Sequence, residues 1–262
     1  MTKMKKLTAA IVMLTLALNS AAQCTFRNTA VKNGEFISYN LYYNWKFIWV
    51  KAGTATMSTV ETHYDGKRAF RTSLTTRGNG RLDDFFVLRD TLLGYTTTDM
   101  APLYYRKGAR EGKRYTVDEA FYSYPNGNCK VKLHRQNNDG THSWATKSLE
   151  NCVFDMVNIF QRARSFDPSN WKPGHEVKFH ITDGTKILDA KLKYSGRETV
   201  KADNGKKYNC LKLSYIENSD GGYHEIARFF VTNDSRHIPV RLDMFLRFGS
   251  AKAFLTKIES LK

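Results

Sequence analysis

Two pairs of neighbouring carboxylates, Asp83–Asp84 and Asp118–Glu119, are the first candidates for chemistry in this sequence. Glycoside hydrolysis needs two carboxyl groups held about 5–10 Å apart across a sugar. Adjacent residues of a strand point to opposite faces of the sheet, so Asp118 and Glu119 cannot form such a pair by themselves. Asp83–Asp84 is typical of the negative charge at the start of a short helical turn, expected over residues 81–87. The sequence therefore predicts no catalytic residue, and an envelope hydrolase acting on a glycan is kept as an alternative.

The seven histidines are scattered, and none of the four cysteines lies in a Cys-x-x-Cys or Cys/His array. The sequence therefore predicts no metal site and no cofactor. In an oxidising compartment Cys24, Cys129, Cys152 and Cys210 can pair in three ways. Cys129 lies on the apolar face of a predicted strand and Cys152 at the start of a predicted helix, which favours a Cys129–Cys152 disulfide.

Alternation of apolar and polar residues dominates the chain and predicts antiparallel strands with one buried face. Clear runs of this kind occupy residues 37–45, 188–194, 211–215 and 240–248. Asp-Gly or Asn-Gly pairs at 65–66, 139–140 and 204–205 supply the positive φ angles of tight hairpin turns. Roughly ten long strands in one chain must curl or split to protect their edges.

We therefore expect a mainly β fold: a large curved antiparallel sheet, open or closed like a barrel, with one main helix packed against it. The helix is predicted after residue 150, where Asn151 can cap it. Its apolar stripe consists of Val153, Met156, Val157, Phe160 and Ala163. Residues 23–262 then form a single β-rich domain, and two packed β-halves divided near residue 150 are the alternative.

The N-terminus has the pattern of a secretory signal peptide over residues 1–22. Lys3, Lys5 and Lys6 precede an uncharged apolar run at 7–18, and Ser20-Ala21-Ala22 provides a cleavage site. The run is too short for the roughly 20 residues of a membrane-spanning helix, so we expect no transmembrane segment after cleavage. Gln23 stands where a lipobox needs a small residue before Cys24, which argues against lipidation.

Removing the three lysines of the signal peptide lowers the formal net charge from +16 to +13. A surface this basic suits anionic partners, and export excludes nucleic acid in favour of anionic components of the cell envelope. The lysines are also dispersed, as they are when they only cover the solvent face of strands.

Several short motifs in fixed order resemble the DUF3108 family, exported proteins of unknown function from Gram-negative bacteria. The resemblance covers nearly all of the predicted mature chain and rests on residues 34–39, 53–55, 155–162 and 237–240. One departure is Phe229-Phe230-Val231, where members of the family often carry Trp. The resemblance implies a periplasmic or cell-surface location, and it supplies no active site.

These observations favour an exported, non-catalytic binding protein or scaffold of the cell envelope. A sheet curved around an apolar cavity could hold a lipid or a lipoprotein segment. The expected cavity lining is Tyr39, Leu41, Met156, Phe160, Leu213 and Leu242. Asp155 and Arg162 are expected at its rim, unless they form only ion pairs. A structural domain that binds only proteins, with the same side chains packed into a solid core, remains the alternative.

Overall fold

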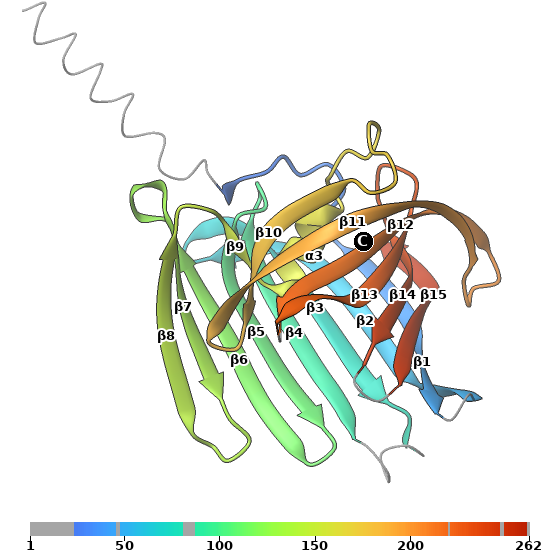
Figure 1. The fold of residues 1–262 in the computed structure, drawn as a ribbon, viewed down its shortest axis with the longest axis horizontal. Coiled ribbons are helices and arrows are strands. Elements are labelled where there is room, and N and C mark those ends of the chain that lie inside the picture. Colours follow the sequence, from blue (N-terminus) through green and yellow to red (C-terminus); the bar gives the residue numbers. More distant parts are fainter. Residues whose placement is uncertain (1–23, 46–47, 81–86, 220, 247–248, 261–262) are drawn as a thin grey trace, which may run out of the picture.

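The computed structural model describes residues 24–45, 48–80, 87–219, 221–246 and 249–260, and Figure 1 shows its fold. One sheet of 15 strands is nearly closed into a barrel. The elements are β1 (Glu35–Trp45), β2 (Ile48–Tyr64), β3 (Lys67–Gly78), β4 (Leu88–Thr97), β5 (Pro102–Glu111), β6 (Arg114–Ser123), the 3₁₀ turn η2 (Pro125–Gly127), β7 (Cys129–Gln136), β8 (His142–Leu149), β9 (Val153–Phe154), α3 (Met156–Ala163), β10 (Glu176–Asp183), β11 (Lys186–Lys201), β12 (Lys207–Ser219), β13 (Gly222–Thr232), β14 (Pro239–Phe245) and β15 (Ser250–Ser260).

The strand order confirms the predicted curved antiparallel sheet. It runs β8-β7-β6-β5-β4-β3-β2-β1-β15-β14-β13-β12-β11-β10-β9, and β1 pairs with the last strand, β15. Every pair is antiparallel except β9 with β10. The two edge strands, β8 and β9, are consecutive in the chain, and residue 150 lies between them.

The predicted turn at residues 65–66 shows why the hairpins form where they do. Asp65 and Gly66 both have positive φ, 50° and 73°, and Tyr64 pairs with Lys67 on either side of them. Two consecutive positive φ angles give a turn whose twist matches that of the flanking strands. The register of β2 with β3 is fixed from this turn, so the same faces of both strands are buried.

The alternation of β1 places its apolar residues in a packed core with β2, β14 and β15. Ile37, Tyr39 and Leu41 belong to one core cluster with Val240 and Leu255, and all five are buried. Full burial of an aliphatic side chain contributes about 1.5–3 kcal/mol. Leu255→Ala would therefore cost about 2–5 kcal/mol, because a cavity is left behind.

Helix α3 lies between the strands β2–β5 behind it and β10–β13 in front of it (Figure 1). It begins at Met156, so the predicted start at Asn151 is wrong. Val153 and Phe154 instead pair with β10 as strand β9. Asp155 is the N-cap, and its Oδ1 accepts hydrogen bonds from the N–H groups of Val157 (3.1 Å) and Asn158 (2.9 Å).

The disulfide joins Cys24 to Cys152, with Cα atoms 5.4 Å apart, so the predicted Cys129–Cys152 pair is wrong. Cys129 is a free, buried thiol in β7, where it lies opposite Leu149. The prediction rested on the apolar face of Cys129 and on Cys152 at the start of a predicted helix, whereas the fold brings the N-terminal segment next to the start of β9. Burial raises the pKa of the Cys129 thiol and keeps it protonated.

Two further predictions concern helices. The helical turn expected over residues 81–87 falls almost entirely outside the described residues. Among the described residues, no helix has the length and apolarity needed to span a membrane.

Candidate functional site

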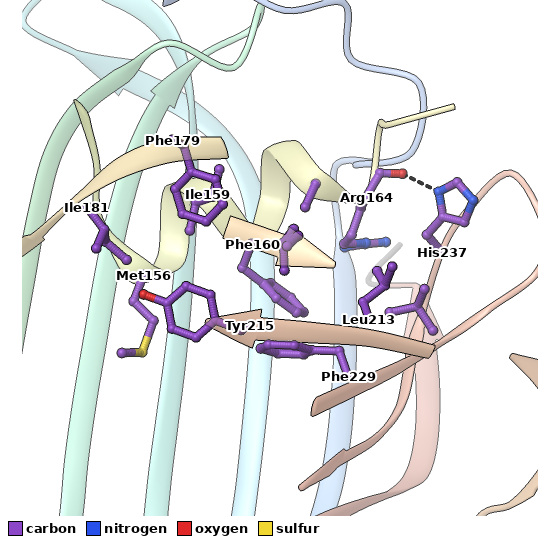
Figure 2. Close-up of a pocket in the computed structure, with 13 residues that line it drawn as sticks. Met156, Ile159, Phe160, Arg164, Phe179, Ile181, Leu213, Tyr215, Phe229 and His237 are labelled. Carbon is purple, nitrogen blue, oxygen red and sulfur yellow. Dashed lines mark hydrogen bonds between the residues drawn. The ribbon is translucent and has the colours of Figure 1, made fainter. Parts of the chain in front are cut away.

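An apolar pocket lies between α3 and strands β10–β13, and Figure 2 shows its lining. Its lining residues are Met156, Ile159, Phe160, Ala163, Arg164, Phe179, Ile181, Leu192, Leu213, Tyr215, Phe229, Val231 and His237. The cavity volume is about 50 Å³, which leaves room for a few water molecules at most. Met156 is nevertheless 46% exposed, so its side chain is not fully covered by protein. We name this cavity the inner pocket.

A larger hollow of about 340 Å³ lies between α3, the N-terminal segment, β9, β10 and the loop after α3. It is lined by Phe26, Phe154, Ile159, Arg162, Phe166, Asp167, Trp171, Val177, Lys178 and Phe179. Ile159 and Phe179 also line the inner pocket, so the two cavities adjoin at these side chains. A volume of about 300 Å³ or more is typical of small-molecule sites. We name this cavity the outer hollow.

Arg162 is a half-buried cation that lines the outer hollow. Its Nη1 donates a hydrogen bond to the Cys24 carbonyl at 2.7 Å. Its guanidinium carbon lies 4.6 Å from the ring centre of Phe26 and 5.0 Å from that of Phe154. Burial lowers the pKa of Arg162 to about 10, so the group is still charged at neutral pH. No carboxylate among the described residues forms an ion pair with it, and Asp167 accepts from Ser169 N instead.

Four polar residues at three-residue spacing hold α3 against strands β1–β6, and all four are buried: Asp155, Asn158, Gln161 and Arg164. Asp155 Oδ2 accepts from the Tyr122 hydroxyl of β6 at 3.0 Å. Gln161 Nε2 donates to the paired hydroxyls of Thr59 (2.9 Å) and Thr72 (2.8 Å) in β2 and β3. Because these groups find partners in the sheet, α3 turns its polar stripe to β1–β6. Its opposite side, with Met156, Ile159, Phe160 and Ala163, lines the inner pocket.

Glycine lets the helix approach the sheet closely. A Cβ atom on Gly94 of β4 would lie 2.7 Å from Asn158 Oδ1 and 2.8 Å from Val157 Cγ1. Real Cβ atoms do not come this close to neighbours, so any larger residue would push α3 away. Glycine at position 94 therefore allows α3 to pack this close to β4.

Asp155 is a fully buried carboxyl group at the start of α3 with a strongly raised pKa. Burial raises its pKa from the usual 3.8 to about 7, and the bonds donated by Asn158, Tyr122 and Val157 oppose the rise. A carboxyl group that is enclosed and saturated with partners is a structural cap, with no path to a ligand in either cavity.

The predicted site residues are divided between the two cavities and the core. Met156, Phe160 and Leu213 line the inner pocket, and Arg162 lines the outer hollow. Tyr39, Leu41 and Leu242 do not line either of them: the first two are buried in the core and Leu242 packs against it. Asp155 caps α3 instead of standing at a rim. The prediction assumed an open barrel interior. In the structure, α3 and the core side chains fill most of the space that the curved sheet encloses.

The carboxylates considered for hydrolysis are not brought together. Asp118 Oδ1 lies 3.6 Å from Arg135 Nη1, whereas Glu119 binds His134 Nδ1 at 2.9 Å. Arg135 and His134 are neighbours on β7, so the two carboxylates lie on opposite faces, as expected from their adjacency. Asp83–Asp84 falls outside the described residues. Within the described ranges, no three His, Cys, Asp or Glu side chains form a group that could hold a metal ion.

Sequence reasoning missed the aromatic lining of the outer hollow and the polar attachment of α3. The polar attachment of α3 had a signal in the sequence. Its polar residues recur every three positions beside the apolar stripe, at Asp155, Asn158, Gln161 and Arg164. The aromatic lining of the outer hollow had no signal in the sequence. Its residues Phe26, Phe166 and Trp171 lie in segments without regular periodicity and meet only in the fold.

Comparison with known proteins gives a family and a fold. The family model described as "Protein of unknown function (DUF3108)" matches residues 38–256. A crystal structure of a beta-barrel-like protein of the DUF1849 family from Brucella abortus matches with a TM-score of 0.53 at 13% identity, over 89% of this chain and 100% of that one. No curated protein sequence matches the chain.

Two further solved structures have lower scores. A protein inferred to be exported, with a YmcC-like fold, from Bacteroides fragilis gives a TM-score of 0.37 at 10% identity, over 91% of this chain and 100% of that one. A protein inferred to be a lipoprotein, from Parabacteroides distasonis, gives a TM-score of 0.39 at 10% identity. The match covers 90% of this chain and 99% of that one.

The Brucella structure therefore shows the same barrel-like fold, without any information on activity. The family match extends over most of the chain and includes the sheet, α3 and most of the residues around both cavities. The chain belongs to the DUF3108 family.

Proposed function

We propose that this protein is an exported, non-catalytic binding protein of the Gram-negative cell envelope, and that the outer hollow holds an apolar ligand with an anionic head. A lipid or the acylated segment of a lipoprotein has this chemistry. The periplasm is the compartment that fits the predicted signal peptide, and the basic surface suits contact with anionic envelope components.

The observation that carries the proposal is the guanidinium of Arg162. It is half-buried beside a hollow of about 340 Å³, and its one hydrogen bond among the described residues goes to a carbonyl. Burying a cation without an anionic partner is costly, because water is lost and no opposite charge replaces it. A carboxylate or phosphate in the hollow would compensate this charge through charge-assisted hydrogen bonds.

The rest of the hollow suits the apolar part of such a ligand. Aromatic rings from the N-terminal segment, β9, β10 and the loop after α3 line it, including Phe26, Phe154 and Trp171. Ligand affinity in a lining of this kind comes from buried apolar area, about 25 cal/mol per Å². Displacement of Ile159 and Phe179 would extend the site into the inner pocket.

Binding of cis-parinaric acid, a fluorescent fatty acid, to the delipidated mature protein tests the proposal. Arg162→Met should weaken binding of the acid by about tenfold or more, the value of a charge-assisted hydrogen bond. It should leave binding of the methyl ester unchanged. Val177→Trp fills the hollow and should weaken binding of both probes. Arg68→Met, on an exposed arginine of β3, is the matched control.

Equal binding of the acid and the ester, or an Arg162→Met variant that binds the acid normally, would contradict the anionic head. No binding of either probe would contradict the ligand site altogether. Native mass spectrometry of protein purified from its host gives an independent readout, because a co-purified lipid should be absent from the Val177→Trp variant.

A further inference from the structure

Two hairpins that are distant in the sequence end side by side and expose apolar side chains. Asn44 of β1 lies opposite Trp49 of β2 and opposite Ser250 of β15, and Ser250 lies opposite Phe245 of β14. The exposed apolar residues at these ends are Ile48, Trp49, Val50, Phe245 and Leu246, with Ile48 the most exposed at 66%. We name these five residues the hairpin patch. Both hairpins end on the lower right of Figure 1, away from α3.

Cations border the hairpin patch. Lys252 Nζ lies 4.4 Å from the ring centre of Trp49. Lys51 is exposed two residues after Trp49, on the same face of β2. The guanidinium carbon of Arg228 lies 5.4 Å from the ring centre of Phe245, although Arg228 is also paired with Glu225. The predicted mature chain carries a formal net charge of +13.

We propose that the hairpin patch docks the protein onto a bilayer surface that carries anionic phospholipid. Apolar side chains at the ends of hairpins can enter the boundary between headgroups and acyl chains, where aromatic rings are favoured. Lysines directly behind them then lie at the level of the headgroups and attract anionic lipid. Isolated clusters of exposed apolar residues of this kind mark interaction sites. The proposal is independent of the ligand in the outer hollow.

Co-sedimentation of the mature protein with vesicles of phosphatidylglycerol and phosphatidylethanolamine tests this docking. The double variant Trp49→Ser/Phe245→Ser should lower the partition coefficient by about tenfold or more, because it removes most of the inserted apolar area. Lys51→Gln/Lys252→Gln should also lower it by about tenfold or more, but only on anionic vesicles and only at low salt. Vesicles of phosphatidylcholine alone provide the comparison.

Tyr223→Ser is the matched control and should bind vesicles normally. Tyr223 is 55% exposed at the start of β13, and Lys191 Nζ lies 4.7 Å from its ring centre, so it repeats the aromatic–lysine pair away from the patch. Thermal unfolding and cis-parinaric acid binding should be unchanged in the double variants, which separates this proposal from that for the outer hollow.

The proposal is overturned if the wild-type protein does not sediment with anionic vesicles, or if the Trp49→Ser/Phe245→Ser variant sediments equally well. Size-exclusion chromatography tests the main alternative, in which a second copy of the chain covers the hairpin patch. A dimer that becomes monomeric in this variant, without vesicle binding by the wild type, would assign the patch to a second copy of the chain and overturn membrane docking.

Discussion

Glu35, the first residue of β1, and Arg164, the residue after α3, form a buried ion pair with two hydrogen bonds. Arg164 Nη1 lies 2.5 Å from Glu35 Oε1, and Nη2 lies 2.9 Å from Oε2. The side chain of Arg164 is only 2% exposed and that of Glu35 only 9%. Arg164 also donates to the Arg236 carbonyl, and its own carbonyl interacts with His237 Nδ1 at 2.5 Å. The pair therefore joins the helix to β1 and to the loop before β14.

Arg164→Met should destabilise the protein by about 3–5 kcal/mol, because it leaves the Glu35 carboxylate buried without its partner. Urea unfolding measures the loss. The control is Arg68→Met, which breaks the exposed pair of Arg68 with Glu61 (3.1 Å) and should cost less than about 1 kcal/mol. Similar small losses in both variants would show that the buried pair does not hold α3 in place.

Gly94→Ala should lower the free energy of unfolding by about 1–3 kcal/mol, because the new methyl group overlaps Val157 and Asn158. In a strand, alanine is otherwise at least as favourable as glycine. Gly222→Ala is the control, because a Cβ there meets only His224 Nε2 at 3.7 Å. If both variants are equally stable, α3 does not rest on β4 as closely as described.

Strand alternation predicted much of the sheet because half-buried antiparallel strands display their burial pattern directly in sequence. The run of Ile37, Tyr39 and Leu41 in β1 is an example, and these residues do form core. Tyr39 and Leu41 are also predicted to line a cavity, which alternation cannot determine. A buried face looks the same in sequence whether side chains from other elements or a ligand cover it.

The polar face of α3 shows a second limit of sequence reasoning. Asn158 and Gln161 have the composition of a solvent-exposed stripe, yet both are buried. The partners of Gln161, Thr59 and Thr72, lie about 90–100 residues away in the chain, and Asn158 donates to the Tyr95 carbonyl of β4. The outer hollow depends in the same way on Phe26, which is brought to α3 by long-range contacts with no local signal.

The pH dependence of stability should reveal Asp155. Its pKa is raised from 3.8 to about 7 by burial, so the folded protein binds this proton more tightly than the unfolded chain. The resulting stabilisation is complete below about pH 4 and is lost as the pH rises through about 7, at about 1.4 kcal/mol per pH unit. Asp155→Asn should remove this dependence, as measured by urea unfolding from pH 4 to pH 8.

Asp90 contributes to the same pH window and needs its own control. Burial, with a smaller contribution from Glu111, raises its pKa to about 6, so its effect on stability has the same sign. Asp90→Asn should therefore reduce the fall in the free energy of unfolding with pH only up to about pH 6. The free energy of unfolding is plotted against pH for the Asp155→Asn variant. If its slope between pH 6 and pH 7 equals that of the wild type, the carboxyl of Asp155 is ionised in the folded protein throughout that range.

The disulfide of Cys24 bears on the predicted processing of the N-terminus. A sulfur bonded to Cys152 cannot also form the thioether of a lipoprotein, which agrees with the unfavourable Gln23 before it. We expect a mature chain that begins at Gln23 and has no lipid. Intact-mass analysis of protein from its native host tests this, and a diacylglycerol adduct on Cys24 would exclude both the disulfide and the predicted cleavage site.

Cys24→Ser should lower stability by up to about 5 kcal/mol, the chain-entropy value for a cross-link between residues 128 positions apart. It should also weaken cis-parinaric acid binding, because the N-terminal segment contributes Phe26 to the outer hollow and the Cys24 carbonyl to Arg162. Cys152→Ser and the double variant provide the control. Since they remove the same bond, all three should show nearly the same loss in urea unfolding under oxidising conditions. Additive losses, or a Cys129→Ser variant that loses its disulfide in peptide mapping, would mean that Cys24 and Cys152 are not partners.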